Sequence, residues 1–251
     1  MNTKKLITIV CVLIFTIGTT NAQNDEKSSN GSVENTWDEL LTKYVTVDGL
    51  VDYKGFASEK QKLEKYIDFI KLNYPDDSWS DNEKMAYWIN AYNTFTVWLI
   101  LDNYPLKSIM KIKEKGKSAW DIKFIDIGGK IYSLNDIEHN ILRKEFNDPR
   151  IHFGINCASY SCPKLLNTAI KANELDTRLD NLAKGFVNDS DRNNIKKDKI
   201  KISQLFKWFP EDFTKEGSLI DYLNKYSDIK IATDAKVEFL EYNWNLNENQ
   251  E

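Results

Sequence analysis

The sequence is poor in the residues that most often carry nucleophilic or metal chemistry. Its 251 residues include three cysteines and two histidines. Cys11 lies in an apolar leader, so only Cys157 and Cys162 are left to pair, which permits one disulfide and excludes a disulfide-based scaffold. The chain also has no internal repeat, no low-complexity tract and no glycine-rich phosphate loop, so repeat architectures and nucleotide-binding loops are not expected.

The N-terminus has the three parts of a secretory signal peptide. Met1–Lys5 is short and basic, Leu6–Ile17 is apolar, and the residues up to Ala22 form a small-residue cleavage site. We expect a signal peptide over residues 1–22 that is cleaved after Ala22, and an exported protein, periplasmic or extracellular. The apolar run is shorter than the roughly 20 residues that span a bilayer, and no second long run follows, so no transmembrane segment is expected. Bulky residues precede Cys11, which argues against a lipid anchor.

The charge balance argues against nucleic-acid binding. Removing Lys4 and Lys5 with the leader leaves 32 of the 34 basic residues against 38 acidic ones. A net charge of about −6 gives no basic face for a duplex. Residues 23–35 are polar and rich in Ser, Asn and Gly, so we expect a flexible N-terminal tether. Residues 36–247 are long enough for a single α+β domain.

Apolar periodicity predicts a mostly helical α+β domain with a small antiparallel sheet. A long buried helix is expected over Met85–Leu101, because this segment is apolar nearly all round and Ser80 and Glu83 form a capping box before it. Gly128-Gly129 predicts a hairpin between residues 123–127 and 130–132. Further elements are expected as helices near residues 37–45, 63–70, 134–146, 175–186 and 218–226, and as strands at 194–202 and 237–244.

One stretch, residues 148–165, holds one of the two histidines and both cysteines that follow the leader, and it reads DPRIHFGINCASYSCPKL. Ile151, Phe153 and Ile155 alternate with His152 and Gly154, which predicts a half-buried strand. The small and polar residues 156–161 predict a loop after it. A histidine on a strand that leads into a cysteine-bearing loop is one way to place a nucleophile and a base together.

Three motifs give a family resemblance. WINAYN at residues 88–93, SLNDIEHNILR at 133–143, and the stretch at 148–165 resemble an uncharacterised family of bacterial exported and plant proteins, the domain-of-unknown-function family 547. The resemblance implies an α+β domain that is secreted or anchored at the bacterial envelope, and it implies no known reaction. A distant likeness to papain-type or transglutaminase-like folds requires a permuted order, because both histidines precede Cys157 here.

In the catalytic interpretation, Cys157 is the nucleophile and one of the two histidines is the base. We rank His139 slightly above His152, because an extended strand rises about 3.3 Å per residue and would hold His152 away from Cys157. Glu138 is next to His139 in sequence, but we expect it to project elsewhere. The predicted function is then an exported thiol-dependent hydrolase or transferase on peptide-like or small amide substrates.

Several polar residues have both a structural and a functional interpretation. Asn90 and Asn93 interrupt the long buried helix, and they either tie loops to the core or orient the catalytic histidine and bind substrate oxygens. Arg143 and Arg150 either bind a substrate carboxylate or pair with acids. Ser159 is a further candidate substrate-binding residue in the cysteine loop.

The alternative to an enzyme is a periplasmic binding or interaction module with a Cys157–Cys162 disulfide. In such a module the cluster of histidines and arginines binds an anionic ligand or supports the fold. Under either interpretation the partner to consider is a small-molecule or peptide ligand. A zinc site built from both cysteines and both histidines has an unfamiliar ligand spacing, so neither a metal nor another cofactor is expected. The aromatic residues of this part of the chain line a pocket or belong to the core; they are Phe206, Trp208, Phe209 and Phe213.

Overall fold

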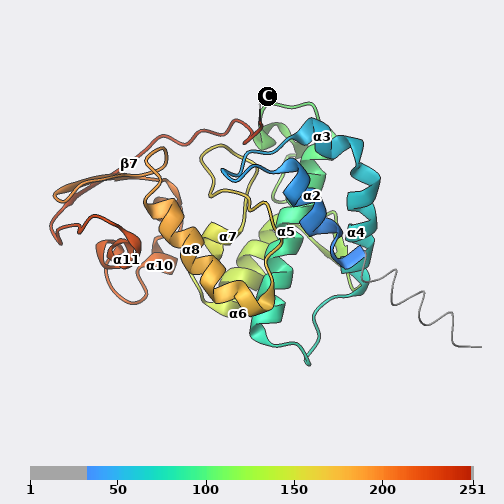
Figure 1. The fold of residues 1–251 in the computed structure, drawn as a ribbon, viewed down its shortest axis with the longest axis horizontal. Helices are drawn as coiled ribbons and strands as arrows, with labels where there is room; N and C mark the ends of the chain where they lie inside the picture. Colours follow the sequence, from blue (N-terminus) through green and yellow to red (C-terminus); the bar gives the residue numbers. More distant parts are fainter. Residues whose placement is uncertain (1–32, 250–251) are drawn as a thin grey trace, which may run out of the picture.

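A single long helix, α5 (Asp81–Asn103), runs through the centre of the computed structural model, which describes residues 33–249 (Figure 1). Fourteen of its residues are buried, on all sides of the helix. Ser80 and Glu83 form the capping box at its start, as the sequence predicts. The expected signal peptide and most of the expected tether lie outside the described residues.

Amphipathic helices cover α5 on one side, each through an apolar stripe at helical spacing. On α2, Trp37, Leu40, Leu41 and Tyr44 are buried, and α4 buries its own stripe against α2 and α5. The helices of this N-terminal part are α2 (Thr36–Tyr44), α3 (Tyr53–Ser58) and α4 (Lys60–Leu72).

Short elements follow α5 and carry most of the candidate residues. A 3-10 turn and two antiparallel hairpins come first, and the second hairpin turns at Gly128-Gly129 as predicted. A π-helical segment, η2, packs directly on α5. The bounds are η1 (Ile109–Lys111), β1 (Lys113–Glu114), β2 (Lys117–Ser118), β3 (Ile125–Ile127), β4 (Lys130–Tyr132), η2 (Asp136–Leu142), α6 (Arg143–Phe146) and α7 (Ile151–Gly154).

The C-terminal part forms a second group of elements beside α8, on the left in Figure 1. Its three-stranded sheet has the order β5-β6-β7, with β5 antiparallel and β7 parallel to β6. The parallel pair arises because three helices separate β6 from β7. The elements are η3 (Ala172–Glu174), α8 (Leu175–Val187), β5 (Asn194–Ile195), β6 (Lys199–Ile202), α9 (Leu205–Trp208), α10 (Pro210–Phe213), α11 (Leu219–Tyr226) and β7 (Lys236–Phe239).

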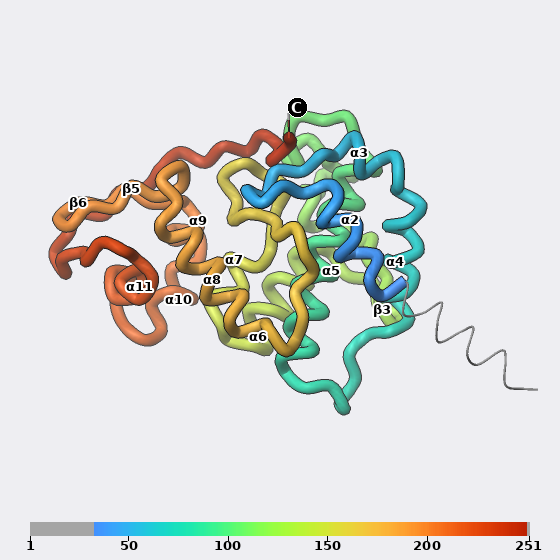
Figure 2. The backbone as a smooth tube through the Cα atoms, viewed as in Figure 1, coloured from blue at the N-terminus to red at the C-terminus, as the bar shows by residue number. Residues whose placement is uncertain are grey.

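The chain after β7 leaves this group and returns across the molecule to the N-terminal part (Figure 2). It pairs there with two separate segments. Leu246 bridges Ser159 in the cysteine loop, and Glu248 bridges Val51 just before α3. The end of the chain therefore ties the cysteine loop to the N-terminal part of the fold.

These features confirm a mostly helical α+β domain with small sheets. Within residues 33–249, none of the helices has both the length and the apolar character needed to cross a membrane.

The strand predicted over residues 151–155 is wrong, because Ile151–Gly154 is the helical turn α7. Asp148 starts this turn by accepting a hydrogen bond from the backbone N–H of Arg150 at 2.8 Å. Ile151, His152, Phe153 and Gly154 are all buried. Alternation in sequence therefore does not reflect one buried face here, and periodicity cannot distinguish a fully buried turn from a strand.

The two asparagines of α5 tie other segments to the helix. Asn93 donates to the carbonyl of Gly154 at 2.9 Å and accepts from the N–H of Asn156 at 2.8 Å. Asn90 makes the same pair of bonds with the backbone of Ile170, at 2.8 and 3.0 Å. Each amide thus supplies hydrogen-bond partners for backbone N–H and carbonyl groups that are not paired in a sheet or helix.

We expect Asn93→Ala to lower the free energy of unfolding by about 2–4 kcal/mol, because it leaves a buried carbonyl and a buried N–H without partners. Urea denaturation measures the effect. Asn82→Ala is the matched control, since Asn82 lies on the exposed face of the same helix. Equal stability of the two variants would contradict the role given to Asn93.

Candidate active site

The loop that carries Cys157 is held by the side-chain amide of Asn156 and by backbone hydrogen bonds with the C-terminal segment. Asn156 donates to the carbonyl of Pro163 at 2.7 Å and accepts from the N–H of Ala158 at 2.8 Å. Asn247, from the C-terminal segment, donates its backbone N–H to the carbonyl of Ala158 at 3.2 Å. These bonds fix the residues on both sides of Cys157.

Ala158 has a left-handed backbone conformation, with φ of 58°. A residue with a Cβ atom adopts this conformation at a cost of about 1–3 kcal/mol and only where its surroundings enforce it. Here the enforcing bonds come from Asn156 and Asn247, and Ala158 is itself fully buried. The strained residue lies between Cys157 and Ser159, so it sets the direction of both side chains.

The thiol of Cys157 is partly exposed and is surrounded by hydrogen-bonding groups. Its Sγ lies 3.0 Å from Ser159 Oγ and 3.5 Å from the Tyr242 hydroxyl, and Ser159 Oγ is 3.0 Å from the same hydroxyl. Hydrogen bonds from Cys162, Ser159 and Tyr242 favour the thiolate, and they outweigh burial and lower the pKa of Cys157 to about 7. A substantial fraction of Cys157 is then thiolate at neutral pH.

Cys162 is a free thiol beside Cys157 and has the opposite character. Its Sγ accepts a hydrogen bond from the N–H of Cys157 at 3.0 Å. Burial and the neighbouring sulfur of Cys157 raise the pKa of Cys162 well above its ordinary value. Of the two cysteines, Cys157 is therefore the nucleophile candidate and Cys162 a supporting group.

Cys157 opens onto a cavity of about 180 Å³. Six aromatic side chains line it, and its polar lining includes one carboxyl group, both histidines and both cysteines. The aromatic residues are Tyr92, Trp120, Trp208, Phe209, Tyr242 and Trp244. Trp208 and Phe209 thus line a pocket, whereas Phe206 and Phe213 are buried in the core; the sequence left both interpretations open.

Glu138 is the carboxyl group of this cavity, and the expectation that it projects elsewhere is wrong. It is buried on η2 and accepts a hydrogen bond from the Tyr92 hydroxyl at 3.2 Å. Burial, together with the negative charge of the Cys157 thiolate, raises the pKa of Glu138 to about 7. Cys157 and Glu138 thus titrate in the same range and influence each other, so near neutral pH the pair holds about one proton.

His139 lines the same cavity but its Nδ1 is occupied. Arg143 Nη1 lies 3.2 Å from His139 Nδ1. Because a guanidinium can only donate, Nδ1 accepts and the proton of the neutral ring is on Nε2. Burial and the charge of Arg143 lower the pKa of His139, so the ring is neutral at pH 7.

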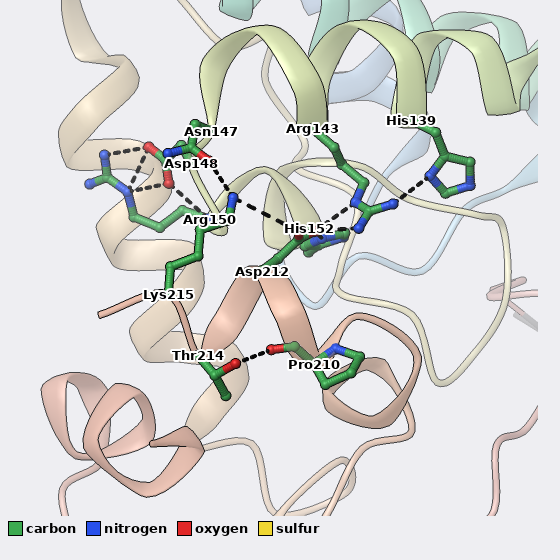
Figure 3. Close-up of polar contacts among 10 residues, drawn as sticks. All are labelled: His139, Arg143, Asn147, Asp148, Arg150, His152, Pro210, Asp212, Thr214 and Lys215. Atoms are coloured by element: carbon green, nitrogen blue, oxygen red, sulfur yellow. Dashed lines mark hydrogen bonds and ion pairs between the residues drawn. The ribbon is translucent and has the colours of Figure 1, made fainter. Parts of the chain in front are cut away.

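His152 belongs to a cluster around Asp212 (Figure 3). Its Nε2 lies 2.7 Å from Asp212 Oδ2, and Arg143 binds both oxygens of the same carboxylate, at 2.6 and 3.1 Å. Burial lowers the pKa of His152, so the neutral ring donates Nε2–H to Asp212. His152 Nδ1 is buried without a hydrogen-bond partner among the described residues, and the ring is stacked against Phe209 at 4.2 Å.

Four predicted site residues are paired with other groups and do not line this cavity. Asn90 and Asn93 are used by the backbone of other segments, as described above. Arg150 forms ion pairs with three aspartates, each at 2.8 Å; they are Asp148, Asp176 and Asp180. Arg143 is bound by Asp212. The structure therefore brings together Cys157, Ser159 and both histidines, and it leaves neither arginine with an unpaired guanidinium for a substrate carboxylate.

The residues that sequence reasoning missed are Tyr92, Glu138, Asp212 and Tyr242. Glu138 had a signal: it is four residues after Leu134 and four before Leu142, so it falls inside the apolar stripe of its helix. A charged residue at such a position is costly unless it has a function or a partner. Asp212 and Tyr242 lie far along the chain from Cys157, and no local pattern marks them.

No three His, Cys, Asp or Glu side chains within residues 33–249 converge in a way that could hold a metal ion. The zinc alternative therefore has no ligand group in this part of the chain.

Comparison with known proteins gives a match to one family model over part of the chain. Residues 77–187 match the family described as "Protein of unknown function, DUF547". All three motifs that carry the resemblance lie in this range, and the resemblance is confirmed. No curated protein and no solved structure matches the chain. The likeness to papain and transglutaminase folds stays a prediction.

We expect iodoacetamide to label Cys157, and not Cys162, with a midpoint near pH 7 in the absence of reductant. Tyr242→Phe should raise the midpoint by about half a unit to one unit, because it removes a donor to the thiolate. Intact mass and peptide mapping give the rates. Tyr160→Phe, on the exposed part of the same loop, is the control and should leave the midpoint unchanged. Labelling that begins only after reduction would instead show a Cys157–Cys162 disulfide.

Asp212→Asn should destabilise the protein most at neutral pH. Although burial alone raises it, hydrogen bonds from His152 and Arg143 hold the pKa of Asp212 well below its ordinary value. Such a group stabilises the fold above the unfolded-state pKa of about 4, and this stabilisation is lost as the pH falls. We expect a loss of about 3 kcal/mol at pH 7 and a smaller one near pH 2, measured by urea denaturation.

The control for this comparison is Asp126→Asn, at an exposed position of β3. A loss of stability at Asp212 that is the same at both pH values would show that the carboxylate charge does not contribute.

Proposed function

Given that residues 77–187 match a family of unknown function, we propose that the protein is a thiol-dependent hydrolase or acyl transferase that acts on small amide, ester or peptide-like substrates. Cys157 is the nucleophile, and Glu138 transfers protons. Ser159 and Tyr242 stabilise the thiolate. Export belongs to the proposal as well, since it is expected from the sequence of residues 1–22.

The observation that carries the proposal is the pairing of a thiol and a carboxyl group, both with a pKa of about 7, in one small cavity. An ordinary buried cysteine has a raised pKa and is inert. Here three side chains direct hydrogen bonds toward the sulfur, and a strained backbone residue orients it. Perturbed groups that share a cavity are typical of catalytic sites.

Glu138 is a better proton-transfer group than either histidine. His139 uses Nδ1 to accept from Arg143, and its remaining nitrogen carries the proton. His152 donates to Asp212 and its other nitrogen is buried beneath the stacked ring of Phe209. Neither ring offers the cavity a basic lone pair. Glu138 does, through a carboxyl group that lines the cavity and that titrates near the pH of use.

The reaction starts with thiolate at Cys157 and a protonated Glu138. The sulfur attacks the carbonyl carbon, and the tetrahedral intermediate collapses as the bond to the leaving amine breaks. Glu138 donates its proton to that amine, which leaves a thioester and a carboxylate. The carboxylate then takes a proton from water as the water oxygen attacks the thioester, and the Cys157 thiolate departs. Another acceptor in place of water gives transfer rather than hydrolysis.

A binding module with a Cys157–Cys162 disulfide is the second candidate. It is favoured by the closeness of the two cysteines, since the N–H of Cys157 lies 3.0 Å from Cys162 Sγ, and an exported protein meets oxidising conditions. In that case the cavity binds a ligand without turnover.

The test uses 4-nitrophenyl acetate and a simple anilide as substrates. The wild type should form an acetyl-enzyme, about 42 Da heavier because an acetyl group replaces the thiol hydrogen, with the label on Cys157. Cys157→Ser should form none. Glu138→Gln should lower kcat by about 10²–10⁴ and flatten the pH profile, because it removes the group that protonates the leaving amine and activates water.

Glu145→Gln is the matched control, since Glu145 is exposed on α6 and outside the cavity lining. Turnover by Cys157→Ser at the wild-type rate would overturn the proposal. Equal losses in the two glutamine variants would remove Glu138 from the mechanism.

A further inference from the structure

The walls of the cavity are tryptophan and tyrosine side chains that contact one another. Trp208 and Trp244 stack with centroids 5.6 Å apart, and Tyr242 lies 4.7 and 4.4 Å from them. Trp120 meets the edge of Trp244 at 5.7 Å. Trp208 is nevertheless 43% exposed. A large apolar ring that is neither in the core nor covered, at the edge of a cavity, is available to a ligand.

The cavity lining carries no positive charge. Its residues include no lysine and no arginine. Two guanidinium groups contact lining residues, and each is already paired with a carboxylate. Arg143 is bound by both oxygens of Asp212, and Arg192, which donates to the carbonyl of Cys162, is bound by Asp189. His139 and His152 are neutral at pH 7, because burial lowers the pKa of each. The only charge that the lining holds near neutral pH is the negative one shared by Cys157 and Glu138.

The size of the cavity limits what fits. An apolar cavity of about 150 Å³ in another protein holds a benzene molecule. The cavity here, at about 180 Å³, therefore accommodates one six-membered ring with a small planar substituent.

We infer that the site selects acyl compounds that carry a single aromatic ring, or an apolar group of that size, and no negative charge near the acyl carbon. The ring packs against the wall formed by Trp120, Trp208, Tyr242 and Trp244. A carboxylate or phosphate in the same place meets the shared negative charge without a cation to balance it. The reaction at the acyl carbon rests on the proposed function, whereas the selection of the ring does not.

Three molecules of nearly equal shape test the inference: benzamide, benzoate and benzamidinium, which differ in charge. Each is added at pH 8, and the rate at which iodoacetamide labels Cys157 is measured. Benzamide and benzamidinium should protect Cys157 from labelling. Equal protection by benzoate should need an about tenfold higher concentration, because repulsion between like charges in a partly screened cavity weakens its binding by about that factor. Aromatic walls also attract the cation.

Trp244→Ala should weaken protection by benzamide about tenfold, because it removes part of the wall. Trp79→Ala is the matched control, since Trp79 lies outside this cavity, against Tyr87 on α5. Equal protection by benzoate and benzamide, or no effect of Trp244→Ala on protection, would overturn the inference.

The same molecules separate this inference from the proposed function. Quenching of tryptophan fluorescence by benzamide in Cys157→Ser reports binding without any reaction. Binding by this variant, together with no acyl-enzyme in the wild type, would support the inferred ligand selection and overturn the proposed enzymatic activity. Equal rates of acyl-enzyme formation from phenylacetyl and succinyl 4-nitrophenyl esters would support the enzyme and overturn the inferred selection of an uncharged aromatic ring.

Discussion

Three buried asparagines hold the backbone around Cys157, and the candidate site depends on them. Asn93 of the central helix and Asn156 of the loop act through their side chains, and Asn247 of the C-terminal segment donates its backbone N–H. The side-chain amides of Asn93 and Asn156 each donate to a backbone carbonyl and accept from a backbone N–H of this stretch. A loop of this kind can therefore be buried and rigid without joining a sheet. The left-handed Ala158 is stable only inside this arrangement.

Asp212 organises the charged side of the site in a similar way. One carboxylate accepts from Arg143 and His152, and Arg143 in turn binds His139. The tautomers of both histidines and the position of the arginine thus follow from one residue (Figure 3). The two histidines and Arg143 are thereby engaged with one another. In the proposed reaction, proton transfer therefore falls to Glu138, which accepts no hydrogen bond from this cluster among the described residues.

The sequence predicts the parts of this structure that depend on local chemistry. The capping box at Ser80, the apolar helix that follows and the hairpin at Gly128-Gly129 each need only neighbouring residues. The cysteine loop was recognised as the centre of the site because small polar residues and both cysteines coincide there. The helical turn α7 was missed because its residues are buried on every side, so their pattern carries no period.

Residue type alone predicts that a histidine is the base, but the hydrogen bonds of His139 and His152 do not favour that prediction. A neutral imidazole is a base only where one nitrogen is free, and whether it is free depends on partners far along the chain. Arg143 and Asp212 are those partners here, and Asp212 is sixty residues from His152. The position of Glu138 inside an apolar stripe was the one local sign of its role.

The residues that line the cavity come partly from the segment that matches the family model and partly from the chain that follows it. Cys157, Glu138 and Tyr92 lie within residues 77–187, whereas Trp208, Phe209, Tyr242 and Trp244 come from the C-terminal part of the chain. Tyr242 also donates toward the thiolate, and Asn247 holds the loop from the same segment. The matched segment alone therefore contains Cys157, Glu138 and Trp120, and it lacks the other three side chains of the wall and one of the groups that stabilise the thiolate. The complete cavity requires the chain after β7 to return across the fold, so in the proposed reaction the C-terminal segment contributes to the chemistry as well as to the binding surface.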